Sequence, residues 1–153
     1  MTTDQFISFF KEELFIPELK ATTKTEALHE LVVKLVEAGH VKNDRVILGT
    51  ILQREALGST GIGKGVAIPH CRSLAVGNMQ IAVGISPEGI PFDSRDKKDV
   101  HLIILVMAPP IEDRDQYLPM LGRLCELLNQ TKLRNKLLQA TDYQAFIQLI
   151  YGE

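Results

Sequence analysis

The sequence predicts an α/β layered fold in which one sheet is covered by helices. Two kinds of segment alternate along the 153 residues. Some have apolar side chains at helical spacing, and shorter ones rich in Val and Ile are typical of strands. Residues 100–107 (VHLIILVM) are almost wholly apolar, as in a strand buried on both faces. The length predicts one domain over residues 1–153 with a proper core.

The first third of the chain predicts a helix, a strand and a second helix. Residues 4–10 suit a short helix, and residues 14–19 suit a strand whose Pro17 favours an edge position. Residues 23–26 (TKTE) fit a capping box, which satisfies free N–H groups where a helix begins. Gly39 is expected to end that helix.

A further helix is expected after Asn43, whose side chain can cap the first turn. It ends near residues 57–58. The side chains expected to form its buried stripe are Val46, Ile47, Ile51 and Leu52.

The middle of the chain predicts strands. Residues 65–68 and 79–86 fit this pattern, and residues 89–92 could add another short piece. The apolar run over 100–107 follows after a charged turn and ends at Pro109-Pro110.

The last third predicts three helices. Glu112 and Asp113 suit the first turn of one helix, near its positive end. Residues 131–138 suit a short helix, and residues 141–144 (TDYQ) fit a second capping box that opens the last one.

The charge and the numbers of cysteines and histidines argue against nucleic-acid binding, a disulfide framework and a metal site. The formal charge of −2 gives no electrostatic footprint for nucleic acid. Two cysteines form neither a disulfide framework nor a zinc motif, and the four scattered histidines give no metal site. No segment resembles a signal peptide or is long enough to cross a bilayer, so we expect a cytoplasmic chain without metal or cofactor.

Residues 54–72 (REALGSTGIGKGVAIPHCR) carry the strongest functional signal. Four glycines crowd positions 58–65, and glycines let backbone N–H groups approach an anion. Ser59, Thr60 and Gly61 are candidate phosphate-binding residues, and arginines flank the stretch. His70 is a candidate nucleophile, because neutral imidazole is available near pH 7. Attack on phosphorus would give a phosphohistidine, with Arg54 stabilising the charge.

A nucleotide site is the first alternative. Residues 58–64 match the start of the phosphate-binding loop G-x-x-x-x-G-K-[S/T], but Gly65 replaces the hydroxyl that holds Mg²⁺. The expected helix–strand order is also the reverse of what that loop needs. A Cys71–His70 dyad is disfavoured because neighbours on a strand point to opposite faces. His101 could assist His70 if both point to the same end of the sheet, but a satisfied core histidine is the more common case.

Residues 58–70 (GSTGIGKGVAIPH) resemble the active-site motif of the type-2 (fructose/mannitol class) IIA domains of the bacterial phosphoenolpyruvate:sugar phosphotransferase system. All thirteen positions fit, most closely the form found in nitrogen-regulatory and fructose-specific IIA proteins. The similarity extends from the helix start near Lys24 to the end of the chain.

The resemblance implies a three-layer fold, a mixed and mostly parallel sheet with helices on both sides. It implies that His70 accepts a phosphoryl group from an HPr-like carrier and that Arg54 steadies the phosphate. Many members carry a second active-site histidine at the place that Tyr117 occupies here, so what stabilises the phosphorylated state is open.

Three hypotheses follow. The first is a phosphocarrier of the nitrogen-regulatory kind, and the second is a sugar-specific (fructose or mannitol) IIA component that passes phosphate to a IIB domain. The third is a regulatory binding module in which His70 is unused. Regulators of this family bind sensor kinases and potassium-transport proteins, although no residue of this sequence identifies such a partner.

Overall fold

The structure, a computed structural model, describes residues 1–152. The helices are α1 (Thr3–Ser8), the short 3-10 helix η1 (Glu12–Leu14), α2 (Lys24–Glu37), α3 (Asp44–Ala56), α4 (Tyr117–Leu128), α5 (Thr131–Leu137) and α6 (Tyr143–Tyr151). The strands are β1 (Phe15–Ile16), β2 (Gly61–Gly63), β3 (Val66–Ala67), β4 (His70–Arg72), β5 (Gln80–Ile90) and β6 (Val100–Ala108). No helix within residues 1–152 is long and apolar enough to cross a membrane.

The strands form one mixed sheet in the order β1-β5-β6-β3-β2, and β4 also pairs with β6. The β1–β5, β3–β6 and β4–β6 pairings are parallel, whereas β5–β6 and β2–β3 are antiparallel. β6 is central because β5 covers one of its edges while β3 and then β4 share the other. This is the mixed, mostly parallel sheet that was expected.

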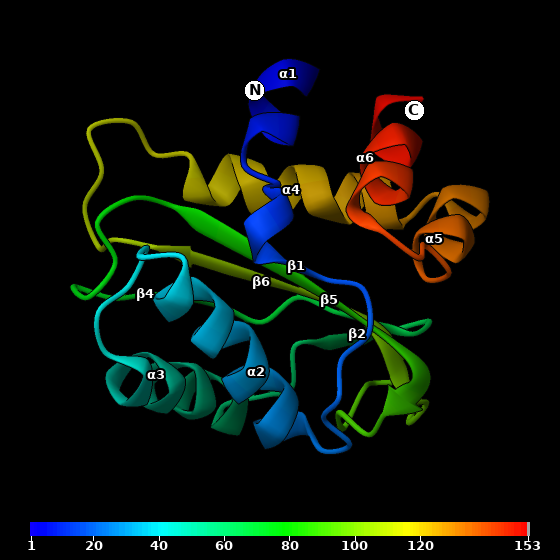
Figure 1. Cartoon of the computed structure of the whole chain (residues 1–153), viewed down its shortest axis with the longest axis horizontal. Helices are drawn as coiled ribbons and strands as arrows, with labels where there is room; N and C mark the ends of the chain where they lie inside the picture. Colours follow the sequence, from blue (N-terminus) through cyan, green and yellow to red (C-terminus); the bar gives the residue numbers. More distant parts are fainter. Residues whose placement is uncertain (153) are drawn as a thin grey trace.

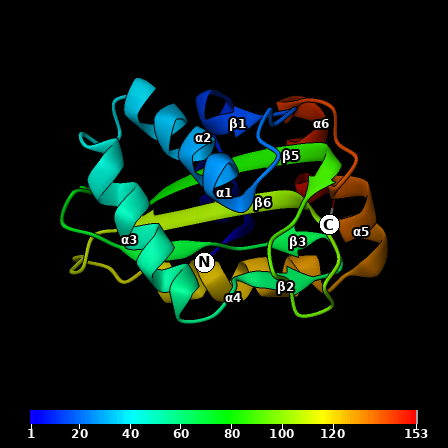
Figure 2. The same cartoon turned by 90° about the horizontal axis from the view of Figure 1, so that it is seen from below.

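Helices cover both faces of the sheet and create two apolar cores. α2 and α3 lie on one face, and α1, α4, α5 and α6 lie on the other (Figure 1). The view from below shows α2 and α3 in front of the strands (Figure 2). Alternate residues of β6 face opposite ways: Ile104 joins the core under α4, and Leu105 joins the core under α2. The predicted three-layer α/β fold is therefore confirmed.

Two helices begin where the capping residues of the sequence predicted. The hydroxyl of Thr23 accepts from the N–H of Glu26, and Asn43 caps α3 through the N–H of Val46. The stripe assigned to α3 is partly wrong, because Val46 is 50% exposed. The last helix is capped by Asp142, one residue after the expected Thr141.

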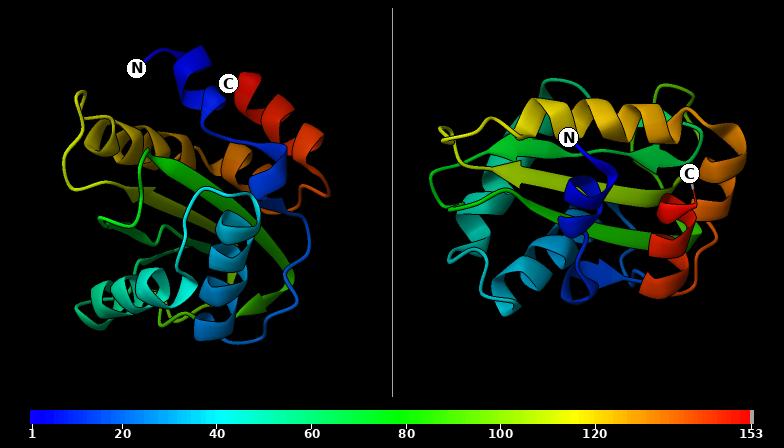
Figure 3. Two further views of the ribbon diagram at one scale, coloured as in Figure 1. Left: turned by 60° about the vertical axis from the view of Figure 1, so that its left-hand side comes forward. Right: turned by 90° about the horizontal axis from the view of Figure 1, so that it is seen from above.

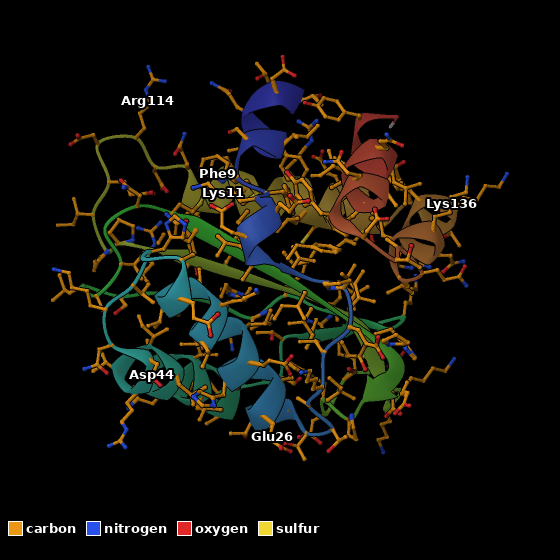
Figure 4. The ribbon with its side chains drawn as sticks, viewed as in Figure 1. Phe9, Lys11, Glu26, Asp44, Arg114 and Lys136 are labelled. Carbon is orange, nitrogen blue, oxygen red and sulfur yellow. The ribbon has the colours of Figure 1, made fainter. Side chains whose placement is uncertain are left out.

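The largest difference from the sequence prediction is the start of α4. Glu112 and Asp113 do not form its first turn, because α4 begins at Tyr117. The carboxylate of Glu112 accepts instead from the N–H of Gln116, in a loop that leads from β6 to the helix. Arg114 stands at the outer tip of this loop (Figure 4).

The strands also differ in extent. Residues 89–90 continue β5 instead of forming a separate piece, with an irregularity in the pairing between Ile85 and Ile90. The glycine-rich stretch contributes two short strands, β2 and β4, that were not expected. β4, the β6–α4 loop and the first turn of α4 gather at one end of the sheet, on the left in Figure 1, and the left panel of Figure 3 shows the same grouping.

Candidate active site

His70 is the first residue of β4 and lies half-buried at that end of the sheet. Its Nδ1 is 2.8 Å from the carbonyl oxygen of Ile68. A carbonyl oxygen can only accept a hydrogen bond, so Nδ1 carries the proton. Nε2 is therefore the nitrogen with a free lone pair, which is the form of imidazole that can act as a nucleophile.

Tyr117, at the start of α4, lies against His70. Their ring centroids are 6.2 Å apart. Burial raises the pKa of the Tyr117 phenol to about 12, and the positive charges of Arg72 and Arg54 only partly oppose this rise. At neutral pH the phenol is therefore uncharged and keeps its hydrogen as a donor.

Arg72 shares a face of β4 with His70, because residues two apart on a strand point the same way. Its Cζ lies 4.5 Å from the centroid of the Tyr117 ring. One of its terminal nitrogens donates to the carbonyl of Pro110, and the other donates to Asp115, each at 3.1 Å. The sequence placed Arg72 beside the motif but gave it no role of its own.

Arg54 lies in the last turn of α3. Its guanidinium donates to the carbonyl of Gly58 at 2.9 Å, which ties the helix to the start of the glycine-rich stretch. Its charge acts on Tyr117, as that of Arg72 does. The structure thus brings together His70, Tyr117 and two arginines from three separate elements.

The hydroxyls of Ser59 and Thr60 both have hydrogen-bond partners within the fold. Ser59 donates to the carbonyl of Phe92 at 2.6 Å and accepts from the N–H of Gly61. The Thr60 hydroxyl donates to the buried carboxylate of Glu55, which also accepts the N–H of Thr60. These hydroxyl hydrogens and the Gly61 N–H are therefore already engaged within the fold.

The fold requires glycine at position 61 because a side chain has no space there. The requirement does not come from a positive φ, which a loop that curves around an anion would need. The φ of Gly61 lies outside the left-handed region. A Cβ at this position would instead clash with Oγ of Ser94. An ion pair also holds this stretch in place. Lys24 pairs with the Glu55 carboxylate at 2.9 Å, and the same carboxylate accepts hydrogen bonds from Thr60, the residue before Gly61.

His101 lies far from His70 along the sheet. The strand partner of His70 is Val106, five residues along β6 from His101, or roughly 16 Å at the usual rise of a strand. His101 bonds through Nδ1 to the carbonyl of Ser86 at 2.8 Å. It lines a separate pocket with Glu18 and Asn135.

Cys71 points away from His70 into the core under α2 and α3. Burial raises the pKa of its thiol to about 11, so the reactive thiolate is disfavoured at neutral pH. A Cys71–His70 dyad is therefore absent. Within residues 1–152, no group of three or more His, Cys, Asp or Glu side chains could hold a metal ion.

The chain is similar to known phosphotransfer proteins over most of its length. The family model described as "Phosphoenolpyruvate-dependent sugar phosphotransferase system, EIIA 2" matches residues 8–152. A fructose-specific EIIA component of Haloferax volcanii is 35% identical over 132 residues, 86% of this chain and 85% of that protein. A nitrogen regulatory protein of Bradyrhizobium diazoefficiens is 34% identical over 138 residues, which cover 90% and 89% of the two chains.

A longer relative and a solved structure extend this similarity. The fructose-specific EIIABC component of Bacillus subtilis is 34% identical over 86% of this chain, which spans only 21% of that protein. The crystal structure of nitrogen regulatory protein IIA-Ntr from Neisseria meningitidis superposes with a TM-score of 0.86 at 25% identity. That match covers 95% of this chain and 99% of the other.

Proposed function

Because the chain belongs to the EIIA 2 family of the phosphoenolpyruvate-dependent sugar phosphotransferase system, we propose that it carries a phosphoryl group on His70. The observation that carries this proposal is the free Nε2 of His70, next to a neutral phenol that Arg72 contacts and on which the charge of Arg54 also acts. A nucleophile beside positive charge is the arrangement that phosphoryl transfer requires.

The donor is an HPr-like protein that bears a phosphohistidine. Nε2 of His70 attacks the phosphorus atom, a P–N bond forms, and the P–N bond to the donor breaks. The electron pair of the broken bond stays with the donor's imidazole. Nδ1 keeps its proton because the Ile68 carbonyl accepts it, so no proton leaves His70 during transfer. The phosphorylated ring therefore carries one positive charge next to the negative phosphoryl oxygens.

Arg54 and Tyr117 have different parts in this step. Negative charge is spread over the phosphoryl oxygens during transfer, so a nearby guanidinium stabilises it. Arg54 supplies that charge from the end of α3, where its bond to Gly58 holds the side chain. Tyr117 donates a hydrogen bond but adds no charge, because a phenol is neutral at pH 7 and burial raises its pKa further.

The surface around His70 suits a protein donor. Four exposed apolar side chains lie within a few residues of the site or in its loop, at the end of α3, after β4, in the β6–α4 loop and in α4. They are Leu57, Leu74, Ile111 and Leu118. Exposed apolar side chains that gather around a reactive group are typical of a protein–protein contact. An HPr-like donor, and a IIB domain as acceptor, would both dock here.

We place the protein in the nitrogen-regulatory branch as the first candidate. The free-standing nitrogen regulatory relative of Bradyrhizobium diazoefficiens and the IIA-Ntr structure from Neisseria meningitidis both match nearly their whole lengths, which supports this choice. A sugar-specific role is the second candidate, because the fructose-specific relative of Haloferax volcanii is equally similar.

The test is a phosphorylation assay with radiolabelled phosphoenolpyruvate and the general carrier proteins of the system. We expect acid-labile, base-stable label on the wild-type chain and none on His70→Ala. An unlabelled wild-type chain would exclude the carrier function and favour a binding module. Addition of fructose- and mannitol-specific IIB domains then separates the branches, because onward transfer indicates the sugar role and retained label the regulatory one.

A further inference from the structure

The site beside His70 needs more positive charge than its aromatic partner can give. A phosphoryl group on His70 would place about two negative charges on its oxygens at a half-buried position, and the single positive charge of a ring that keeps its Nδ1 proton balances them only in part. Charge in such a place is costly unless it is paired. Tyr117, which occupies the adjacent space on α4, is neutral and can only donate a hydrogen bond.

Arg72 lies where this charge is needed. It is two residues from His70 on the same face of β4, so the two Cα atoms are roughly 6–7 Å apart. Both side chains lie against the Tyr117 ring, with its centroid 6.2 Å from the His70 ring and 4.5 Å from Cζ of Arg72. An arginine side chain is long enough to span that gap to a group on Nε2.

We propose that Arg72 is a second phosphate-binding cation, which holds the phosphoryl group on His70 together with Arg54. This inference rests on the proposed phosphorylation of His70. The guanidinium has five N–H donors, and its bonds to Pro110 and Asp115 use one on each terminal nitrogen. Donors of the same planar group therefore remain for phosphate oxygens.

Asp115 positions this arginine before transfer. Its Oδ1 accepts from Arg72 and also from the N–H of Tyr117 at the start of α4. The carboxylate therefore fixes the guanidinium over the Tyr117 ring. Its side chain is 55% exposed, and such an exposed ion pair contributes little net stability, so Arg72 can turn from it to a doubly charged phosphoryl group.

The experiment compares Arg72→Ala, Arg72→Gln and Arg72→Lys with wild type in transfer from a phosphorylated HPr-like protein. Two quantities are measured: the rate at saturating donor, and the fraction of chain phosphorylated at equilibrium. For the alanine and glutamine variants we expect both the rate and the equilibrium constant to fall about tenfold or more, the loss expected for one charge-assisted hydrogen bond. Arg72→Lys restores charge and should recover part of each loss.

Arg114→Ala is the matched control, because it removes an exposed arginine from the neighbouring loop without touching Tyr117 (Figure 4). We expect wild-type behaviour from it. Melting temperatures identify variants that have lost stability, and Arg72→Gln keeps the proposal testable if Arg72→Ala unfolds.

Several outcomes would overturn the role of Arg72 while leaving phosphorylation of His70 intact. They are wild-type values in both neutral variants, a loss that disappears at saturating donor, an equal loss in Arg114→Ala, and no recovery in Arg72→Lys. An unlabelled wild-type chain would instead remove the proposed function itself.

Discussion

The two histidines on the sheet, His70 and His101, share the same local bonding and differ in what surrounds them. Each is half-buried, and each has Nδ1 2.8 Å from a backbone carbonyl, of Ile68 in one case and Ser86 in the other. Each therefore keeps its proton on Nδ1 and its lone pair on Nε2. His101 therefore has the same tautomer that makes His70 a good nucleophile, and the tautomer alone does not distinguish them.

The surroundings separate the two sites. Around His70 the structure gathers an aromatic ring and two arginines whose charges act on it. The pocket beside His101 is lined by the carboxylate of Glu18 and by neutral side chains, with no lysine or arginine among its described lining residues. A doubly negative phosphoryl group would be stabilised at the first site and opposed at the second.

The largest expected difference between the two histidines is in phosphorylation of their alanine variants. We expect His70→Ala to abolish phosphorylation, and we expect His101→Ala to be labelled at a rate within about twofold of wild type, the small change usual for residues remote from the chemistry. The measurement is label incorporation at equal protein and donor concentration. Strong loss in His101→Ala at an unchanged melting temperature would show that the two histidines act together.

Arg54→Ala should have the next largest effect. It removes one cation from the His70 end, so we expect phosphorylation about ten- to a hundredfold slower, as for loss of one charge-assisted hydrogen bond. The melting temperature should change little, because the guanidinium makes a single bond at the helix end, to Gly58. Parallel loss of rate and melting temperature would instead make Arg54 a structural residue.

Gly89→Ala should have the opposite effect to Arg54→Ala. We expect it to lower the stability of the chain and to leave phosphorylation of His70 unchanged. Gly89 has φ of +88°, and a Cβ there would lie 2.9 Å from Cβ of Asp99 and 3.0 Å from the His101 ring. Strain and overpacking of this kind cost about 1–3 kcal/mol. Urea unfolding measures the loss, and the rate of labelling at His70, under conditions where the variant is folded, should equal that of wild type.

Gly49→Ala is the control for that substitution. Gly49 lies inside α3, its φ is not positive, and nothing lies within 4 Å of a Cβ built there. Alanine in a helix interior should stabilise the chain by about 0.5–1 kcal/mol. If both variants were equally destabilised, the close contact of Gly89 with His101 would not be the cause.

Much of the fold follows from local signals. Thr23 and Asn43 cap helices through bonds that span only three residues, and the apolar run of β6 is visible without any partner. The start of α4 was missed for a physical reason. Acidic residues before an apolar pattern resemble a first helical turn, but Glu112 and Asp115 here bond to N–H groups farther along the chain.

The composition of the site depends on contacts between distant segments, which sequence alone does not reveal. The motif suggested that Ser59 and Thr60 bind phosphate, because nothing local shows that Phe92 and Glu55 take their hydroxyl hydrogens. The separation of His101 from His70 depends on the register of β4 against β6. The spacing of His70 and Arg72 was available, since residues two apart on a strand share a face, but this alternation was used only to separate Cys71 from His70.

Tyr117→Phe should give the smallest effect, and it sharpens the distinction between charge and hydrogen bonding at the His70 end. The variant keeps the ring that lies against His70 and Arg72 and loses only the hydroxyl. We expect phosphorylation to slow by less than about tenfold, because one neutral hydrogen bond contributes about 0.5–1.5 kcal/mol. A loss as large as that of Arg54→Ala would mean that the phenol, not the guanidinium, dominates stabilisation of the phosphoryl group.

The alkaline behaviour of the same variant gives an independent check. Burial raises the pKa of Tyr117 from 10.0 to about 12, so the folded chain holds this proton more tightly than the unfolded chain does. The resulting stability is fully present below pH 10 and is lost as the pH rises toward 12. Tyr117→Phe should therefore lose less stability than wild type between pH 10 and 12 in urea unfolding. Identical pH dependence in the two proteins would mean that the phenol titrates as if exposed, so that burial does not raise its pKa in the folded chain.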